Sequence, residues 1–335
     1  MSEQTPFNPA PYEKYRVDLT AELMDNPVLL TINGVVISTL ANFSLWIGKA
    51  KSKKTFLLTS LTAAAACSHC SIETVKGVFR PDANKILYFD TEQSPFHVQR
   101  TIKRICKQIG ISEPGNLTAY GLRPVSPKER LLFIESKAYN TPGLALVVID
   151  GIADLLTKGI NDEPEAIEIL SKLMKWTEEK NIHIITVLHM NKADFNARGV
   201  IGTALQNKAE STIEINKDKK DSTISIVHAL YCRDMDFKDF AFTISDDGVP
   251  ILTDIPPPEK PALLQQKSIF ELILPVPRIV THGVLVAEYM ERTKFKERAT
   301  INHINKAVEN KILDYDTATK GYKLFQFDDD EKPPF

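Results

Sequence analysis

The segment from Trp46 to Thr55 constrains the chain most, because it reads W-I-G-K-A-K-S-K-K-T between an apolar run and a helix-forming run. A glycine-led turn before a helix aims backbone N–H groups at an anion, and the helix dipole favours negative charge there. The segment therefore predicts a phosphate-binding loop, in which Lys54 contacts phosphate oxygens and the Thr55 hydroxyl binds Mg²⁺. The expected nucleotide-binding residues are Gly48, Lys49, Ala50, Lys51, Ser52, Lys53, Lys54, Thr55 and Phe56.

One position of the loop departs from the usual pattern. The residue before Lys54 is usually a glycine, which tolerates positive φ and lets phosphate approach closely, and here it is Lys53. We expect this lysine either to adopt a more ordinary backbone or to be conformationally strained. The alternative interpretation of the segment is a solvated basic surface loop.

The composition excludes several classes of protein. Apolar residues make up 43% and charged residues 25% of the 335 positions, as in a globular protein with a large core and either two domains or one large domain and a small one. The net charge is −2, so any nucleic-acid surface must be local. No stretch approaches the ~18–20 apolar residues that cross a bilayer, and residues 1–11 carry no signal-peptide pattern. We expect a cytoplasmic protein that makes no membrane contact.

Two of the four cysteines, Cys67 and Cys70, have C-x-x-C spacing with His69 between them. Structural zinc needs four ligands, and no second cysteine pair exists. A redox pair is the alternative. Ordinary reduced thiols are the expectation for this pair and for the remaining two cysteines.

Strand-like and helix-like runs alternate through the first 250 residues. The run from Leu144 to Asp150 is continuously apolar, which is typical of a strand buried on both faces. Such alternation predicts an α/β fold with a twisted, mainly parallel sheet and right-handed crossovers. Antiparallel strands are expected after it. The expected strands are 28–32, 35–40, 43–47, 85–90, 116–120, 144–150 and 182–189, the expected helices are 56–67, 98–109, 127–139 and 164–180, and the expected antiparallel strands are 211–215, 223–229 and 240–245.

Polar side chains stand where these predicted strands end, and the carboxyl ends of parallel strands meet at one edge of a sheet. Asp150 is the expected Mg²⁺ ligand beside Thr55. Glu92 is the candidate base that orients an attacking water, and its alternative role is a helix N-terminal acid. His189 ends the next strand and is a candidate sensor of the terminal phosphate, or else a structural histidine.

Three further cations are candidates for contacts across a subunit interface. They are Arg198, in a loop rich in small residues, and Arg233 and Lys238, which follow the strand at 223–229. A cation supplied by a neighbouring subunit stabilises transition-state charge in related chemistry. DNA phosphate contacts and surface salt bridges are the alternatives.

This ordered set of motifs resembles the RecA/DnaB superfamily of ATPase cores, and it is most similar to the RepA-type plasmid replicative helicases and the related AAA-25 group. The resemblance covers about residues 25–252. It implies a RecA-like core that uses ATP and Mg²⁺, with Glu92 activating water, His189 as the sensor and Arg198 as the arginine finger. The motifs that carry it are Gly48–Thr55, Ile86–Glu92, Leu146–Asp150, Leu188-His189, Arg198-Gly199 and Gly202–Leu205.

The same resemblance implies a homo-oligomeric ring, commonly a hexamer, with ATP at the subunit interfaces. Single-stranded DNA would pass through its central channel, where Lys158, Lys192 and Arg198 would contact it.

A proline-rich linker at 255–261 divides the chain. We expect an N-terminal lead-in at 1–24, the ATPase core at 25–254, a second domain at 262–327 and an acidic tail at 328–335. Helices at 263–274, 283–291 and 296–311, followed by a hairpin, resemble a winged helix.

The third of these helices would then be the recognition helix, since residues 292–311 hold six Lys or Arg and two Glu. Protein contacts are the alternative use of such a module. The expected DNA-contacting residues are Lys296, Arg298, Asn302 and Lys306, with Thr300, His303 and Asn305 as further hydrogen-bonding groups.

The sequence thus favours an ATP-hydrolysing, DNA-associated motor of helicase type that acts in the replication or mobilisation of a plasmid or mobile element. The alternative is an ATP-responsive winged-helix DNA-binding regulator or loader with little or no hydrolysis. A nucleotide-metabolising kinase is disfavoured, because a lid-type arginine cluster is missing and a DNA-binding-like module follows the core.

Overall fold

The computed structural model describes residues 8–22, 24–78, 80–190, 197–256, 269–275, 277–293 and 295–325. The chain divides into two compact units, Met1–Ile255 and Pro256–Phe335. No helix in these described segments is both long and apolar enough to cross a membrane.

A nine-stranded sheet forms the centre of the first unit, in the order β12-β11-β10-β9-β3-β8-β7-β5-β6. The strands from β9 to β6 pair in parallel, and β9, β10, β11 and β12 pair antiparallel along the other edge. The fold is therefore α/β with a RecA-like, mainly parallel sheet. The strands are β3 (Phe43–Gly48), β5 (Lys85–Asp90), β6 (Leu117–Gly121), β7 (Leu144–Asp150), β8 (His183–His189), β9 (Ser211–Lys217), β10 (Ser225–Cys232), β11 (Phe240–Ile244) and β12 (Pro250–Thr253).

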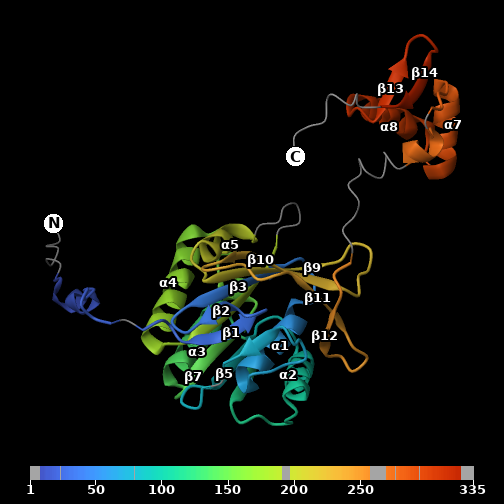
Figure 1. Cartoon of the computed structure of the whole chain (residues 1–335). Helices are drawn as coiled ribbons and strands as arrows, with labels where there is room; N and C mark the ends of the chain where they lie inside the picture. Colours follow the sequence, from blue (N-terminus) through green and yellow to red (C-terminus); the bar gives the residue numbers. More distant parts are fainter. Residues whose placement is uncertain are drawn as a thin grey trace. The chain divides into compact units, whose positions relative to one another are not determined.

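Helices cover both faces of this sheet (Figure 1). Side chains alternate across a strand, so Trp46 of β3 packs with α1 and α2, while its neighbours Leu45 and Ile47 pack with the helices of the other face. Burial on both faces explains why β7 reads as an unbroken apolar run. The helices are α1 (Lys54–Cys67), α2 (Pro95–Ile109), α3 (Pro127–Asn140), α4 (Glu163–Lys180) and α5 (Gly199–Gln206), with the 3₁₀ turn η2 (Ile152–Leu155) after β7.

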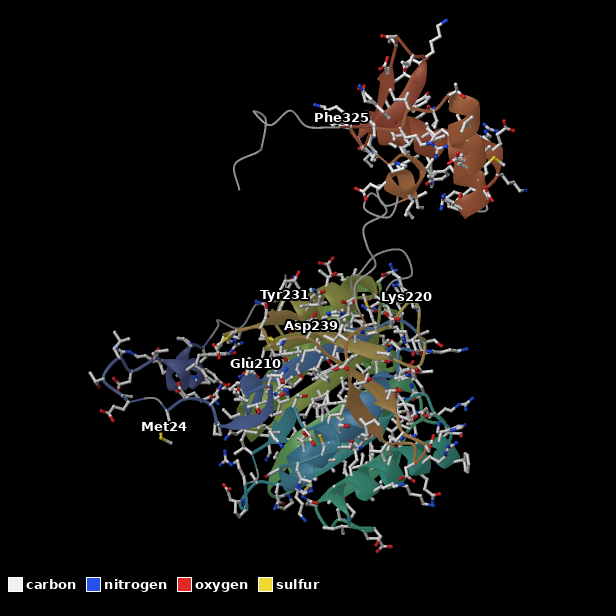
Figure 2. All side chains as sticks on the ribbon, turned by 45° about the vertical axis from the view of Figure 1, so that its right-hand side comes forward. Met24, Glu210, Lys220, Tyr231, Asp239 and Phe325 are labelled. Carbon is white, nitrogen blue, oxygen red and sulfur yellow. The ribbon has the colours of Figure 1, made fainter. Side chains whose placement is uncertain are left out.

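A small antiparallel sheet, in the order β2-β1-β4, packs beside α1. It consists of β1 (Val28–Ile32), β2 (Val35–Thr39) and β4 (Val75–Gly77), and the turn between β1 and β2 places Gly34 at φ +80°. The lead-in holds the short 3₁₀ helix η1 (Ala10–Tyr15), which buries no residue, and Met24 is 92% exposed (Figure 2).

The second unit has its own core, built around Phe270, Tyr289 and Ile304. Its elements are α7 (His282–Thr293), α8 (Glu297–Glu309), β13 (Leu313–Asp316) and β14 (Gly321–Leu324). Val280 bridges Tyr322 of β14, so the polypeptide before α7 adds to the hairpin.

Several expectations about individual elements need revision. The segment 211–215 was expected as an antiparallel strand, whereas β9 pairs in parallel with β3 and antiparallel only with β10. The helix expected from 98 begins at Pro95, because a proline fits the first turn of a helix. β4 and β12 are additional strands, and residues 199–206, which were expected as part of a loop, form α5. The helix expected at 263–274 and the linker at 255–261 lie largely outside the described residues.

Arg130 of α3 connects the loop after β6 with the 3₁₀ turn η2. Its buried guanidinium donates to the backbone oxygens of Leu122, Arg123 and Asp154, at 3.0, 2.9 and 2.8 Å. Replacing it by methionine leaves three carbonyls without this donor, so Arg130→Met should lower the free energy of unfolding by about 2–4 kcal/mol in urea titrations.

Exposed Arg123 supplies the matched control, since Arg123→Met should change the free energy of unfolding by less than about 0.5 kcal/mol. Equal effects of the two variants would contradict this role for Arg130.

Candidate functional site

The register of the parallel strands sets the positions of the polar groups. Gly48 at the end of β3 pairs with His189 at the end of β8, and Asp90 of β5 pairs with Asp150 of β7. All four strands run in the same direction, so these ends meet at one edge of the sheet. One pocket at this edge is lined by the four residues that the sequence analysis expected to lie together, namely Lys54, Glu92, Asp150 and His189.

The loop between β3 and α1 curls tightly. Both Lys51 and Lys53 adopt left-handed backbone conformations, with φ of 63° and 66°. At the start of the loop, a Cβ on Gly48 would lie 2.3 Å from the backbone oxygen of Ile215 and 2.6 Å from Ser52 Oγ, so only glycine fits. Lys53 is therefore not in the ordinary backbone conformation considered above. It occupies the conformation of the glycine it replaces.

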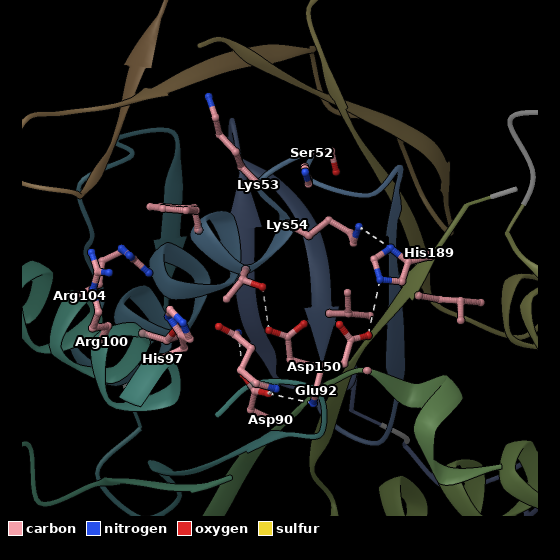
Figure 3. Close-up of a pocket in the computed structure, with 18 residues that line it drawn as sticks. Ser52, Lys53, Lys54, Asp90, Glu92, His97, Arg100, Arg104, Asp150 and His189 are labelled. Carbon is pink, nitrogen blue, oxygen red and sulfur yellow. Dashed lines mark hydrogen bonds and ion pairs between the residues drawn. The ribbon is translucent and has the colours of Figure 1, made fainter. Parts of the chain in front are cut away.

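Lys54 is the first residue of α1, and its ammonium group is held inside the loop. Its Nζ donates to the backbone oxygens of Gly48 and Lys49, at 2.8 and 3.1 Å, and lies 3.2 Å from His189 Nδ1 (Figure 3). Burial lowers the pKa of Lys54 to about 8, although Asp150 and Glu92 partly oppose the shift. An ammonium that is buried and bonded to weak carbonyl partners is well prepared to exchange them for phosphate oxygens.

Thr55 and Asp150 meet beside this lysine. Thr55 Oγ1 donates to Asp150 Oδ2 at 2.9 Å, and the fully buried Tyr88 donates its hydroxyl to the same oxygen at 3.0 Å. Burial, followed by the charge of Asp90, raises the pKa of Asp150 to about 6.

A hydroxyl and a carboxylate are hard oxygen ligands suited to Mg²⁺. Within the described segments no group of three or more His, Cys, Asp or Glu side chains could hold a metal by itself. The donor set therefore fits an Mg²⁺ ion that takes its remaining ligands from phosphate oxygens and water.

Glu92 stands on a turn that Asp90 stabilises. Asp90 Oδ1 accepts from the backbone N–H groups of Glu92 and Gln93, at 3.1 and 2.7 Å, and Asp90 Oδ2 accepts from the Gln93 amide at 2.7 Å. The side chain of Glu92 is 51% exposed, with Oε1 3.5 Å from His189 Nε2. Hydrogen bonding to His189 lowers the pKa of Glu92, so the carboxylate is ionised near neutral pH.

These groups line a pocket of about 490 Å³, a volume within the range of small-molecule sites. Its other end, away from the carboxylates, is formed by Phe56 and by the α2 residues His97, Arg100 and Arg104. The Arg104 guanidinium lies 3.9 Å from the centre of the Phe56 ring, and its Nε donates to the backbone oxygen of Gly248 at 2.7 Å. An aromatic ring and a planar cation offer flat surfaces for a base.

Other candidate cations lie away from this pocket. Arg198 is exposed immediately before α5, and Lys158 is exposed near Asp162, with Nζ to Oδ2 at 3.9 Å. Arg233 and Lys238 are exposed, and Arg233 lines two other hollows that do not include the phosphate loop. Lys192 lies outside the described residues.

Helix α8 presents the four expected DNA-contacting residues, Lys296, Arg298, Asn302 and Lys306, with Lys296 immediately before its first turn and all four exposed. One of the additional hydrogen-bonding groups was assigned wrongly, because Thr300 is 0% exposed and faces the core of the second unit. His303 is half-buried, and its Nδ1 lies 3.1 Å from the Tyr289 hydroxyl.

All four cysteines are free, and Cys67 and Cys70 flank the end of α1. Burial raises the pKa of Cys70 to about 11, which disfavours the thiolate that redox chemistry requires. The described part of the chain also lacks a zinc-like cluster at this place.

Sequence reasoning did not identify Tyr88 and Arg104 as part of the site, and it placed Asp90 at the strand end without its role in the turn. Strand periodicity places Tyr88 on the same face as Asp90, but the partner of a buried hydroxyl depends on the neighbouring strand. The pattern Asp90-Thr91-Glu92 itself is the available signal, because an aspartate two residues before a turn residue commonly accepts its N–H.

Residues 32–194 match a family model described as an AAA domain. No curated protein matches the chain. Among solved structures, the crystal structure of the RadB recombinase aligns with a TM-score of 0.44 and 16% identity, over 64% of this chain and 91% of that chain.

The family match spans the phosphate loop, Asp90, Glu92, Asp150 and His189. The strand order and the site geometry, rather than the weak structural likeness, identify the architecture. The first unit therefore combines a phosphate loop with a RecA-like sheet, and its residues 32–194 are similar to the AAA domain family.

Proposed function

We propose that the protein is an ATP-hydrolysing motor that acts on DNA, of helicase type, in the replication or mobilisation of a plasmid or mobile element. The observation that carries the proposal is the meeting of a phosphate loop, a buried lysine, a hydroxyl–carboxylate pair and an exposed carboxylate around one pocket. Each group matches one requirement of phosphoryl transfer to water.

The chain's own residues would divide the work as follows. The loop backbone and Lys54 would hold the terminal phosphates, and Thr55 with Asp150 would hold Mg²⁺, which when bound would neutralise phosphate charge. Glu92 is ionised and reaches solvent, so it accepts a proton from the attacking water. His189 contacts both Lys54 and Glu92, which supports a role for it in sensing the departure of the terminal phosphate.

The exposed cations away from the pocket would act between subunits. In a ring of identical chains, commonly a hexamer, Arg198, Arg233 or Lys238 would be supplied to the neighbour's pocket. Lys158, Lys192 and Arg198 would face DNA in the channel. What supports this arrangement is that the three cations are exposed and lie outside their own pocket.

The second unit would bind DNA as a winged helix. Support comes from α8, a helix that is apolar toward its core and exposes Arg298, Asn302 and Lys306, followed by a two-stranded hairpin. Cations contact phosphates and the asparagine amide contacts base edges in such modules.

One observation favours the alternative function, an ATP-responsive DNA-binding regulator or loader with slow hydrolysis. Lys53 replaces a glycine in the left-handed region, and a stiffer, strained loop would slow nucleotide exchange. Turnover measurements separate the two functions.

Two loop-proximal substitutions should affect different steps. Lys54→Ala removes the phosphate-binding ammonium and should weaken nucleotide affinity by about 100-fold. Glu92→Gln keeps the shape but removes the base, so affinity should stay within about threefold while turnover falls by about 100- to 1000-fold. Calorimetric binding and phosphate release, with and without single-stranded DNA, check both.

Lys85→Ala, at the opposite end of β5, should leave turnover unchanged. Turnover that rises with single-stranded DNA and disappears in both site variants is expected for a motor. Tight binding with negligible turnover in either condition would favour the regulator instead.

Nucleotide affinity should pass through a maximum with pH. Above the pKa of Lys54, about 8, binding must recapture a proton, so the dissociation constant should rise by about tenfold per pH unit. Below the pKa of Asp150, about 6, Mg²⁺ must displace a proton, so affinity for the magnesium complex should fall as pH decreases. Titrations between pH 5 and 9.5 measure both limbs.

Asp150→Asn serves as the comparison, since protonation of the nucleotide itself acts on both proteins equally. This variant should lose the part of the acid limb that belongs to Asp150 and keep the alkaline limb. An alkaline limb that is missing from the wild type would contradict the assignment of Lys54.

The double variant Arg298→Ala/Lys306→Ala should weaken duplex DNA binding about tenfold at 0.1 M salt, and it should lower the slope of log affinity against log salt by about 2. Fluorescence anisotropy across a salt series measures both quantities. The charge-matched variant Lys103→Ala/Lys128→Ala, exposed on α2 and α3, should bind as the wild type does. Identical slopes for all three proteins would rule out α8 as the DNA-contacting helix.

A further inference from the structure

Lys53 has a backbone conformation that its side chain disfavours. Its φ and ψ are 66° and 29°, in the left-handed region where a Cβ crowds the backbone and glycine is the usual occupant. Its side chain does not cap α1. In Figure 3 it points away from Asp150 and Glu92, so it does not serve the pocket in the way that Lys54 does.

The side chain instead reaches another part of the molecule. Lys53 Nζ donates to the backbone oxygen of Thr223, in the turn between β9 and β10. Thr243 Oγ1 of β11 donates to the same oxygen at 3.0 Å. Partial burial, together with the charge of Lys217, lowers the pKa of Lys53, as expected for an ammonium held against protein.

A second hydrogen bond joins the same two segments. Ser225 Oγ, fully buried at the start of β10, donates to the backbone oxygen of Ser52 at 3.2 Å. At the other end of the loop, Gly48 touches β9 so closely that a Cβ would collide with the backbone oxygen of Ile215. Consecutive residues of the phosphate loop are therefore bonded to β10 and its turn, while the first residue packs on β9.

The turn itself, residues 218–224, is stiff. The backbone N–H of Asp218 donates to the oxygen of Ile224 at 3.0 Å. The side chains of Asp218 and Asp221 accept from the backbone N–H groups of Lys220, Asp221 and Thr223, at 2.9, 2.7 and 2.8 Å. These internal hydrogen bonds hold residues 218–224 in one conformation. A displacement of Thr223 would therefore displace the whole turn.

We propose that Lys53 is a positioning residue that couples the phosphate loop to the β9–β10 turn, so that nucleotide binding orders residues 218–224. The inference rests on the proposed nucleotide site. Lys53 has its backbone in the phosphate loop and its ammonium group against the β9–β10 turn. Any rearrangement of that backbone on binding is therefore transmitted to Thr223. Glycine at this position would relax the loop but break the connection.

Amide hydrogen exchange of the full chain tests this coupling directly. In the wild type, a non-hydrolysable ATP analogue with Mg²⁺ should slow exchange in residues 48–55 and, by ~5-fold, in residues 218–224. Lys53→Met should keep the protection of 48–55 and reduce the response of 218–224 to less than ~2-fold. Lys53→Arg, which keeps a cationic donor, should preserve the response.

Two further variants separate the ammonium from other causes. Lys53→Gly removes both the strain and the ammonium, so agreement of the glycine and methionine variants assigns the effect to the ammonium. Lys220→Met, an exposed lysine of the same turn (Figure 2), should respond as the wild type does.

Two outcomes would overturn the inference in different ways. If the analogue binds and residues 218–224 do not respond in the wild type, or still respond in Lys53→Met, the coupling is wrong and the nucleotide site stands. If calorimetry detects no binding of the analogue to the wild type, the proposed function fails and the coupling fails with it.

Discussion

The register of four parallel strands is the constraint on which the site depends. β3, β8, β7 and β5 end at the same edge, with Gly48 beside His189 and Asp90 beside Asp150. A slip of one residue in any of these pairs would turn the terminal side chain to the opposite face. Burial on both faces prevents such a slip, since the alternating residues of β3 fill two different cores. The stability of the sheet and the geometry of the pocket therefore have the same origin.

Burial shifts the pKa values of two charged groups in the pocket toward neutrality. Lys54 is buried with its pKa lowered to about 8, and Asp150 is buried with its pKa raised to about 6, so each side chain has lost part of its preference for the charged form. Asp90 adds a second buried carboxylate, whose pKa burial also raises. Phosphate oxygens would favour the charged lysine and a metal ion would favour the charged aspartate. A nucleotide that binds together with a metal ion would therefore stabilise the charged forms of both Lys54 and Asp150.

Most of the fold could be predicted because local patterns and tertiary context agree. Continuous apolar runs predicted β7 and β8 as buried strands, and their terminal Asp150 and His189 followed directly. The direction of β9 could not be predicted in this way, since a strand carries no mark of which neighbour it will pair with, and α5 returns the chain parallel to β3. Tyr88 was missed for a similar reason, because its hydroxyl meets Asp150 only across a strand pair. Thr300 was misassigned because helix position alone did not reveal which side faces the core.

The lysine at position 53, where a glycine is usual, combines a strained backbone with a hydrogen bond to the β9–β10 turn. A non-glycine residue in the left-handed region costs about 1–2 kcal/mol, so the loop as a whole must be held by other contacts. A hydrogen bond from an ammonium to a carbonyl is worth an amount of the same order when it is partly shielded. The bond to Thr223 can thus offset much of the strain, and the offset exists only while the hairpin stays in place. A glycine would remove both the strain and this bond, and it would leave the contact between Ser225 and Ser52 as the hydrogen bond that joins the loop to β10. A lysine makes the conformation of the phosphate loop and the position of the β9–β10 turn depend on each other.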